Sequence, residues 1–253
     1  MASTAHSDQR GNIVTTLVVI PTYDEAGNIE RVVADLLRRH PDVDVLVVDD
    51  GSPDGTSDLV AALSAADRRI HLLRRGAKQG LGVAYRAGFA WGLDRGYERL
   101  VEMDADGSHR AEDLQALLDA SAAGADLVLG SRWIPGGGVI DWPWYRRLIS
   151  RGGTWYARLM LGLDIHDLTG GFRVFRAETL RRLDLDDVAS QGYCFQIDMA
   201  RRTAAAGMSI VEVPIMFVER THGHSKMSGA IVREALWRVT LWGIQRALAR
   251  PRR

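Results

Sequence analysis

The chain has 253 residues, 46% of them apolar, which is enough to bury one large hydrophobic core. Its 32 basic and 32 acidic residues cancel, so there is no global basic field for nucleic acid, and any anion site has to come from local clusters. The single cysteine, Cys194, excludes an internal disulfide and a zinc site with several cysteines. We expect it to be a buried, unreactive thiol.

Residues 1–11 are polar and lack the apolar segment of a signal peptide, and no run of about 18 apolar residues predicts a membrane span. We expect a disordered tail at residues 1–12, one catalytic domain at residues 13–228 and an amphipathic basic helix at residues 229–253. The lone cysteine suits a reducing cytosol. These features favour a cytoplasmic protein with a soluble body.

Apolar strands alternate with amphipathic helices over roughly the first 130 residues. The predicted strands are 16–20, 43–48, 70–73, 99–103 and 126–129, and the predicted helices are 28–39, 56–66, 81–96 and 111–122. Nearly all-apolar strands are typical of a parallel sheet that is covered on both faces. The pattern predicts a doubly wound α/β fold, in which ligands bind beyond the carboxyl ends of the strands.

The alternation stops after residue 130. A Gly/Pro loop at 135–138 leads into an aromatic, basic segment at 142–161, where an acceptor site would be added. A helix that begins near Trp144 would place Arg146 and Ser150 on one face, because they are four residues apart. An exposed basic helix start would show the same pattern.

Two carboxylates one residue apart, Asp104 and Asp106, follow the strand at 99–103. Mg²⁺ takes one or two protein carboxylates and fills its other positions with water and substrate phosphate oxygens. The pair therefore indicates a metal-assisted, nucleotide-dependent transferase. Asp is also common in turns at strand ends, so the surrounding motifs have to decide.

Polar residues follow the other strands as well. Tyr23 and Glu25 after the first strand, and Asp50 after the second, could stack on a base or bond its ribose. The same segments are equally well explained as turns with helix caps at Asn28 and at Asp54 or Thr56. Neither a Walker A sequence nor a G-x-G-x-x-G motif after the first strand is present, which disfavours kinases and dinucleotide enzymes.

Taken together, these stretches resemble a known family, the inverting GT-A glycosyltransferases, and within it the polyprenol (dolichol) phosphate mannose synthases. The similarity runs over roughly residues 16–229, in order and at family-like spacing. The matching segments are VIPTYDEAGN (19–28), VVDDGSPDGT (47–56), KQGLGVAY (78–85), MDADGSH (103–109), GSR (130–132), DLTGGFR (167–173), GYCFQID (192–198) and FVERTHGHSK (217–226). All of these motifs together are specific evidence for the family, whereas a single one of them would be weak evidence.

The resemblance implies a GDP-mannose donor and a Mg²⁺ or Mn²⁺ ion on its diphosphate. Metal contacts would come from Asp104, Asp106 and, directly or through water, Ser108, where many relatives have Gln. A lone His109 nearby is more often structural than a ligand or base. The implied donor contacts are Pro21, Tyr23, Glu25, Val48, Asp50, Lys78, Asp104, Ala105 and Asp106, with Arg220 and Lys226 closing over the diphosphate.

The resemblance also implies a polyprenyl monophosphate acceptor. Arg132, Arg146 and Ser150 match the acceptor-phosphate positions, and Asp167 and Gln196, with Asp198, would contact sugar or acceptor. Asp106, Arg132, Arg146 and Ser150 would form the catalytic set. A phosphate monoester is mostly dianionic at neutral pH, so it needs positioning rather than a strong base. In-line attack would invert the anomeric centre and give a β-linked lipid phosphosugar.

The segment after residue 228 is an imperfect amphipathic helix with several arginines. This composition suits the surface of an anionic membrane, whereas we expect most residues of its apolar stripe to pack on the body. Both uses are compatible if the helix lies at the mouth of the acceptor groove. We expect peripheral association with the cytoplasmic face of a membrane, with or without a membrane-anchored partner protein.

Three alternatives to the GDP-mannose reaction fit parts of this pattern. The same fold could use UDP-glucose or another nucleotide sugar. A noncatalytic nucleotide-sugar binding module is disfavoured, because the carboxylate pair and the arginines occur together. A nucleotidyltransferase would require a Gly-rich activating loop near the N-terminus, which the sequence lacks.

Overall fold

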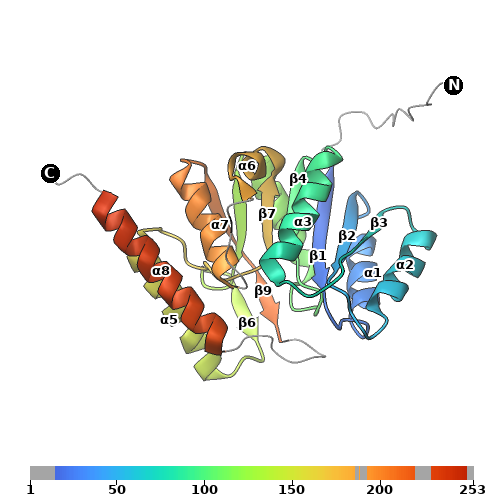
Figure 1. Cartoon of the computed structure of the whole chain (residues 1–253), viewed down its shortest axis with the longest axis horizontal. Coiled ribbons are helices and arrows are strands. Elements are labelled where there is room, and N and C mark those ends of the chain that lie inside the picture. The colour runs from blue at the N-terminus through green and yellow to red at the C-terminus, as the bar shows by residue number, and fades with distance from the viewer. Residues whose placement is uncertain (1–14, 186–187, 189–192, 220–228, 250–253) are drawn as a thin grey trace.

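The structure is a computed structural model that describes residues 15–185, 188, 193–219 and 229–249 (Figure 1). Strands that are apolar on both faces form a central sheet, and helices cover each face of it. The five predicted strands are all present. They are β1 (Thr16–Thr22), β2 (Val43–Asp49), β3 (Ile70–Arg74), β4 (Arg99–Glu102) and β5 (Leu127–Ser131).

The sheet has seven strands in the order β3-β2-β1-β4-β7-β5-β8. The sequence patterns did not predict β7 (Arg173–Arg176) or β8 (Ile210–Pro214). Strand β7 lies between β4 and β5 and is antiparallel to both, whereas the other pairings are parallel. Two further strands, β6 (Gly138–Ile140) and β9 (Met216–Val218), form a small parallel sheet of their own.

The predicted helices are confirmed with small shifts at their ends. They are α1 (Ile29–Arg39), α2 (Thr56–Ala66), α3 (Leu81–Asp94) and α4 (Leu114–Ala122), the last preceded by a 3₁₀ turn at Ala111–Asp113. The remaining helices are α5 (Trp144–Leu161), α6 (Ala177–Arg182), α7 (Tyr193–Ala205) and α8 (Gly229–Ala249). The start of α5 confirms the helix expected near Trp144.

The helix caps differ from the prediction. The Asn28 side chain does not cap α1, because its amide donates to Glu25 Oε2 at 3.0 Å. At α2 the N-cap residue is Gly55, whose positive φ of 87° suits glycine. Asp54 accepts hydrogen bonds from the Thr56 N–H and hydroxyl at 3.1 and 2.6 Å, which satisfies the first amide of that helix.

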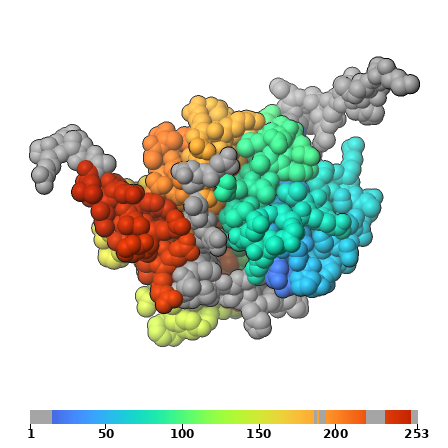
Figure 2. Space-filling model, viewed as in Figure 1, coloured from blue at the N-terminus to red at the C-terminus, as the bar shows by residue number. Residues whose placement is uncertain are grey.

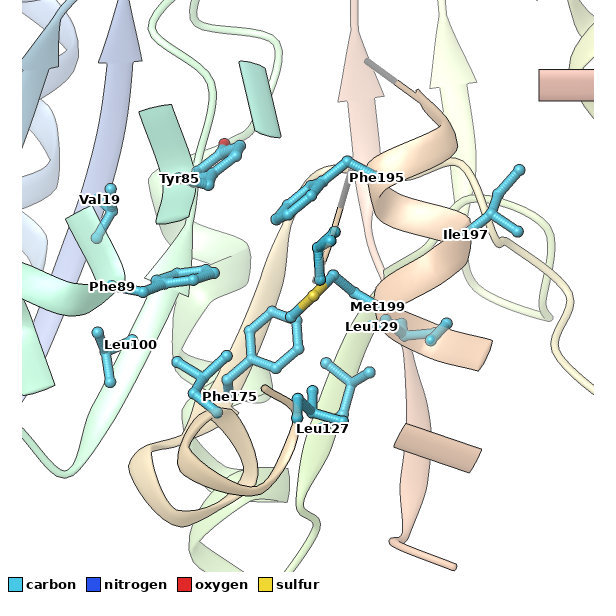
Figure 3. Packing of buried hydrophobic residues seen from close by; sticks show 14 of the residues in the cluster. Val19, Tyr85, Phe89, Leu100, Leu127, Leu129, Phe175, Phe195, Ile197 and Met199 are labelled. Carbon is cyan, nitrogen blue, oxygen red and sulfur yellow. The ribbon is translucent and has the colours of Figure 1, made fainter. Parts of the chain in front are cut away.

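Each face of the sheet carries its own hydrophobic cluster, because alternate residues of a strand point to opposite faces. Leu17 and Val19 face α3, α5 and α7, and Val18 and Ile20 face α1 and α4. Figure 3 shows the first cluster, in which Phe89 of α3 meets the edge of Phe175 of β7 at 5.6 Å between ring centres. The unpredicted strand β7 is thus part of the core.

Helices α5 and α8 lie side by side at one end of the molecule (Figure 1). The Tyr156 and Thr240 hydroxyls are 2.6 Å apart. A side chain at Gly243 would come within 2.6 Å of Met160, so glycine permits the close approach of the two helices. Helix α8 therefore packs on α5 as part of the body. None of the described helices is long and apolar enough to cross a membrane.

Candidate active site

The predicted site residues gather at the carboxyl edge of the parallel strands. Tyr23 follows β1, Asp50 follows β2, Asp104 follows β4 and Arg132 follows β5. The carboxyl ends of parallel strands meet at one edge of a sheet. Motifs that are far apart in the sequence therefore line one side of the molecule.

The edge beside β2 carries a paired carboxylate. Asp50 is buried and accepts from Arg75 Nη1 at 2.7 Å. Burial raises the pKa of Asp50, although the charge of Arg75 opposes the shift. The Lys78 ammonium lies 3.9 Å from the centre of the Tyr23 ring. Sequence reasoning missed Arg75, whose only signal is its position directly after the third strand.

Both of the adjacent carboxylates Asp49 and Asp50 have partners in the structure, and Asp50 also accepts from the Gln79 N–H at 3.4 Å. Asp49 accepts from the Thr22 hydroxyl at 3.0 Å and from the Ser52 hydroxyl at 2.5 Å, so the turn occupies it. Val48 and Ala105 are buried in the two core clusters. Any donor contact by those two residues would have to use main-chain atoms.

The carboxylate pair after β4 is held by its own turn. Asp106 is buried and accepts from the Ser108 N–H at 3.0 Å, whereas the Asp104 side chain is 35% exposed. The Asp104 N–H donates to His109 Nδ1 at 3.0 Å. Since Nδ1 is an acceptor, the His109 proton lies on Nε2, which is 3.9 Å from Asp104 Oδ2. His109 thus helps to position the main chain at Asp104.

Asp104, Asp106 and Ser108 could hold a hard divalent cation. In the part of the chain that the structure describes, no cluster of three His, Cys, Asp or Glu residues could hold a metal by itself. A pair of carboxylates fits Mg²⁺ or Mn²⁺ when substrate phosphate oxygens complete the coordination. The Ser108 hydroxyl is buried and has no hydrogen-bond partner among the described residues, so it could supply a third oxygen to an ion or to its water.

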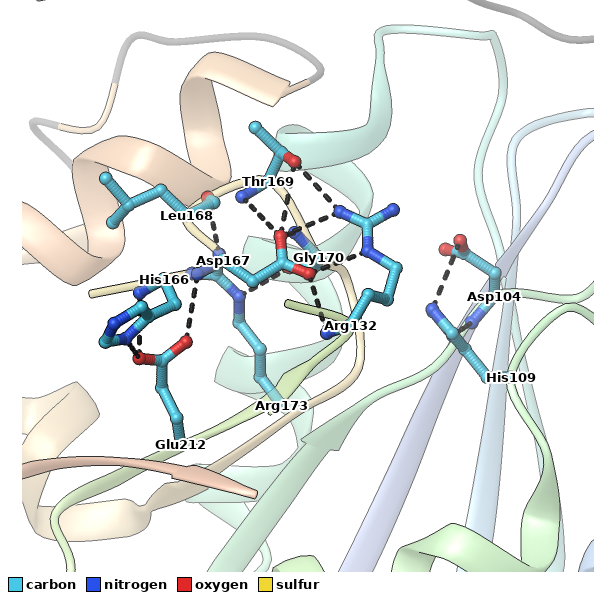
Figure 4. Close-up of polar contacts among 10 residues, drawn as sticks. All are labelled: Asp104, His109, Arg132, His166, Asp167, Leu168, Thr169, Gly170, Arg173 and Glu212. Carbon is cyan, nitrogen blue, oxygen red and sulfur yellow. Dashed lines mark hydrogen bonds and ion pairs between the residues drawn. The ribbon is translucent and has the colours of Figure 1, made fainter. Parts of the chain in front are cut away.

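Arg132 is clamped by a buried carboxylate. Asp167, with no exposed surface, accepts from Arg132 Nε and Nη2, each at 2.7 Å, and from the Arg132 N–H at 3.0 Å (Figure 4). The Gly170 N–H donates to the same carboxylate at 3.1 Å. Burial would raise the pKa of Asp167, but the charge and hydrogen bonds of Arg132 outweigh it and hold the pKa below its ordinary value.

This geometry corrects the prediction that Asp167 contacts sugar or acceptor. Both of its oxygens are occupied by Arg132 and by the turn that follows, and neither faces solvent. A bidentate fork fixes the plane of a guanidinium as well as its position. Asp167 therefore acts on a ligand only through Arg132.

Gln196 and Asp198, the predicted sugar or acceptor contacts on α7, are both buried in the structure. Gln196 is 2% exposed and lies beside Glu102, and Asp198 is bound by Arg201 and Arg202 of its own helix at 2.6 and 3.0 Å. Ile197, between them, reaches the groove described below.

A buried arginine that was not predicted connects the loop before β7 to strand β4, which precedes Asp104 and Asp106. Arg173 donates to the carbonyls of Leu168, Gly170 and Gln196 at 2.9, 2.8 and 2.6 Å. It is the cross-strand neighbour of Glu102, with Nε 3.9 Å from a carboxylate oxygen. Burial raises the pKa of Glu102 to about 8 against the charge of Arg173. The pair fixes the loop before β7 relative to the turn at Asp104.

Arg132, Arg146 and Ser150 line one end of an apolar groove between α5 and α8. The Arg146 guanidinium pairs with Glu219 and lies 4.1 Å from the centre of the Trp142 ring. The apolar walls of the groove include Ile149, Tyr156, Ile197, Val232, Leu236 and Val239. The structure thus brings the three predicted acceptor residues together. The predicted donor contacts Arg220 and Lys226 lie outside the described residues.

Residues 17–184 match the family described as glycosyl transferase family 2. The chain belongs to this family of glycosyltransferases, and its predicted family resemblance is confirmed. It is 54% identical over 238 residues to polyprenol monophosphomannose synthase of Mycolicibacterium smegmatis, a match that covers 94% of this chain and 90% of that protein. It is 55% identical over 228 residues to undecaprenyl-phosphate mannosyltransferase of Micrococcus luteus, covering 90% of this chain and 93% of that protein.

Solved structures with low sequence identity share the fold. A mannosyltransferase from Pyrobaculum calidifontis in complex with GDP-Man and Mn²⁺ has a TM-score of 0.60 at 20% identity; the match covers 94% of this chain and 65%, less than two thirds, of that one. Glucosyl-3-phosphoglycerate synthase from Mycobacterium tuberculosis, in complex with Mn²⁺, UDP-glucose and phosphoglyceric acid, has a TM-score of 0.67 at 19% identity. That match covers 91% of this chain and 80% of the synthase chain. The predicted GT-A fold is confirmed.

Proposed function

We propose that this chain transfers mannose from GDP-mannose to a polyprenyl monophosphate, with inversion, in a reaction that requires Mg²⁺ or Mn²⁺. The acceptor and the sugar are supported by two relatives above 50% identity whose names specify a polyprenol or undecaprenyl phosphate and mannose. The donor and the metal are proposed from the family motifs and from the chemistry of the site. Fold similarity to the Pyrobaculum protein does not carry the donor assignment.

The observation that carries the proposal is the groove between α5 and α8. Arg132 and Arg146 supply its positive charge, and most of its other lining side chains are apolar. A lipid monophosphate has the same division, since a charged head is joined to a long hydrocarbon chain. A small soluble acceptor would not need the apolar walls, whereas a polyprenyl chain is stabilised by them through burial of its surface.

On the donor side, Asp104, Asp106 and Ser108 would hold the metal ion. When bound, the ion would neutralise charge that develops on the diphosphate leaving group. Tyr23, Asp50 and Lys78 are proposed to hold the nucleotide, with Arg75 orienting Asp50 through their 2.7 Å hydrogen bond. Arg220 and Lys226 are proposed to approach the diphosphate from the segment after β9.

Catalysis is proposed to depend on positioning and charge more than on a base. The acceptor phosphate is already an anion, so Arg132 and Arg146 have to aim one oxygen at the anomeric carbon. Asp167 holds the Arg132 guanidinium in one plane, and Ser150 lies one helical turn after Arg146. Direct attack from this side on an α-linked sugar nucleotide gives a β-linked product.

We further propose that the outer surfaces of α5 and α8 contact an anionic phospholipid surface. Trp144, Leu148, Trp155 and Leu159 of α5 are more than half exposed, as are Trp237 and Leu248 of α8. Figure 2 shows α8, in red, at one end of the molecule. Arg147, Arg151 and Arg233 on the same helices are also exposed. Aromatic and basic residues on one surface suit the headgroup region of an anionic membrane, and the acceptor groove lies between the same two helices.

The reaction is tested by transfer of radiolabelled sugar into organic-extractable lipid. GDP-mannose and UDP-glucose are compared, each with and without polyprenyl monophosphate and EDTA. Label entering lipid only from GDP-mannose, only with acceptor and only with metal supports the proposal. Transfer from UDP-glucose would replace the donor, and no lipid product from either donor would refute the lipid acceptor.

An Asp106→Asn variant distinguishes an enzyme from a binding module. We expect transfer to be lost with an unchanged melting temperature, because the side chain keeps its shape but loses the charge that would hold a cation. Asp164→Asn, whose side chain is 88% exposed, is the matched control and should keep full activity. Equal transfer by both variants would contradict the metal assignment.

Membrane contact is tested by flotation with vesicles of phosphatidylglycerol or of phosphatidylcholine alone. The wild-type protein should float with the anionic vesicles, and a Trp155→Ala, Trp237→Ala double variant should not. Leu59→Ala removes a side chain that is 39% exposed on α2, away from this surface, and should float like the wild type. Identical flotation of all three proteins would refute the assigned surface.

A further inference from the structure

We infer that Trp142 is an acceptor-binding residue whose indole N–H donates a hydrogen bond to the phosphate held by Arg132 and Arg146. This inference rests on the proposed function, since it names an additional contact in the same acceptor site. Trp142 precedes α5 and lines the cationic end of the groove together with Arg132, Arg146 and Ser150. It was not among the predicted site residues.

The first observation is that the Trp142 ring lies against both cations. The Arg146 guanidinium carbon is 4.1 Å from the ring centre, and the Arg132 guanidinium carbon is 5.4 Å from it. The negative face of an indole attracts a cation. One ring thus helps to keep two like charges close together before any phosphate has arrived.

The second observation is that the ring cannot turn freely. Trp142 is only 8% exposed. Phe217 meets it nearly edge-on at 5.3 Å between centres, and Trp133 meets it at 6.4 Å. The direction of the indole N–H is therefore set by packing, independently of a ligand.

The third observation is that this N–H has no hydrogen-bond partner among the described residues, although it is buried. Buried tryptophans usually find an acceptor for the N–H, because an unsatisfied buried donor costs free energy. The nearby charged side chains that line the groove, Arg132 and Arg146, are donors themselves and cannot accept it. The missing acceptor is supplied when an anion enters between the two guanidinium groups.

A phosphate oxygen suits this position chemically. A monophosphate has three terminal oxygens, so it can accept from two arginines and an indole while still presenting an oxygen lone pair for attack. A neutral donor holds one oxygen without the additional charge of a third cation. It therefore adds orientation while withdrawing less electron density from the attacking oxygen.

The test uses two matched substitutions, Trp142→Phe and Trp133→Phe. Each removes one indole N–H that is buried without a partner among the described residues, and each keeps an aromatic ring. Trp133 is not among the residues that line the groove, so it controls for the general effect of the replacement. Transfer is measured with polyprenyl phosphate varied at saturating GDP-mannose, and then with the two substrates exchanged.

We expect Trp142→Phe to raise the acceptor KM by about tenfold or more, which is the usual effect of losing a hydrogen bond to a charged group. The GDP-mannose KM and the melting temperature should stay at the wild-type values, because the free protein has no bond to lose. Trp133→Phe should change the acceptor KM much less than Trp142→Phe does, because phenylalanine keeps a ring packed against Trp142. A merely structural Trp142 would alter the melting temperature and both KM values together.

An acceptor KM in Trp142→Phe equal to that in Trp133→Phe would overturn the inference. If the phenylalanine variant melts at a lower temperature, benzothienylalanine at position 142 replaces it, since this residue keeps the indole shape and lacks the N–H. It should show the same rise in acceptor KM, and a wild-type KM would overturn the inference. The wild-type assay separates the two proposals, because failure of the wild-type protein to transfer sugar refutes the proposed function itself.

Discussion

The clamp on Arg132 predicts a large effect of Asp167→Asn. Asparagine keeps the shape and one oxygen, but it replaces the other oxygen by an NH₂ group that faces N–H donors of Arg132 or of the turn. The two hydrogen bonds that Arg132 Nε and Nη2 donate to the carboxylate, each at 2.7 Å, can then no longer both form. Arg132, which is 5% exposed, would be left with a buried charge that is only partly compensated.

The magnitude follows from this burial. Removing one partner of a buried ion pair costs about 3–5 kcal/mol of the free energy of unfolding. Because one oxygen remains for the turn, we expect about 3 kcal/mol, which corresponds to a melting temperature lower by about 6–12 °C in a chain of this size. The acceptor kcat/KM should fall as well, since the plane of the guanidinium is no longer fixed.

Asp164→Asn is the control, because Asp164 pairs with Arg158 at 2.5 Å but is 88% exposed. Such a pair contributes less than about 1 kcal/mol. Urea unfolding of both variants and the wild type at pH 7 measures the two costs. Similar free energies of unfolding for Asp167→Asn and Asp164→Asn would refute the reasoning.

The same variant has a defined dependence on pH. The folded-state pKa of Asp167 is lowered, so its contribution to stability is complete above its ordinary carboxyl pKa and is lost as pH falls through the folded-state value. The difference in stability between wild type and Asp167→Asn should therefore shrink below about pH 4. A difference that stays constant in acid would contradict the assigned cause.

Three further predictions concern other buried or paired groups. Burial raises the pKa of Glu102 from 4.5 to about 8, so the folded state keeps a proton that the unfolded chain releases, and stability should decline as pH rises across that interval. Glu102→Gln should flatten this decline in urea titrations, and equal slopes for the two proteins would speak against it. Burial also raises the pKa of the Cys194 thiol to about 12, and the side chain is 1% exposed. The native protein at pH 8 should therefore leave a thiol reagent unreacted until urea is added; rapid native labelling would show the thiol to be accessible. Glu219 pairs with Arg146, where the acceptor phosphate is proposed to bind. Glu219→Gln should lower the acceptor KM up to about fivefold at low ionic strength, given the usual strength of a partly exposed pair, and a raised KM would assign Glu219 a supporting role instead.

The first half of the fold could be predicted because its strands are apolar on both faces and its helices lie between them. The strand Arg173–Arg176 has two arginines at its ends and only two apolar residues. Nothing in such a segment predicts a central strand. Arg173 is buried there because three carbonyls and Glu102 surround it, and these partners come together only in the folded chain.

The site was predictable to the level of residue type but not of pairing. The Asp104 and Asp106 carboxylates lie at the expected sheet edge, and Arg146 and Ser150 share the expected helix. Asp167 was identified as a polar residue of the acceptor side, yet its partner Arg132 is 35 residues earlier in the sequence. Contacts between residues that are distant in the sequence decide which charged side chains face a ligand and which pair with each other.

The antiparallel strand β7 also determines when the sheet can be completed. Among the described residues, strands β3, β2, β1 and β4 pair with one another, and β5 pairs with β8. Strand β7 is what joins β4 to β5 in this sheet. A growing chain thus exposes the open edges of β4 and β5 until residues 173–176 have been synthesised. Unpaired strand edges are sites of aggregation. From residue 127, where β5 begins, to residue 176, where β7 ends, completion of the sheet during synthesis therefore depends on a strand of four residues.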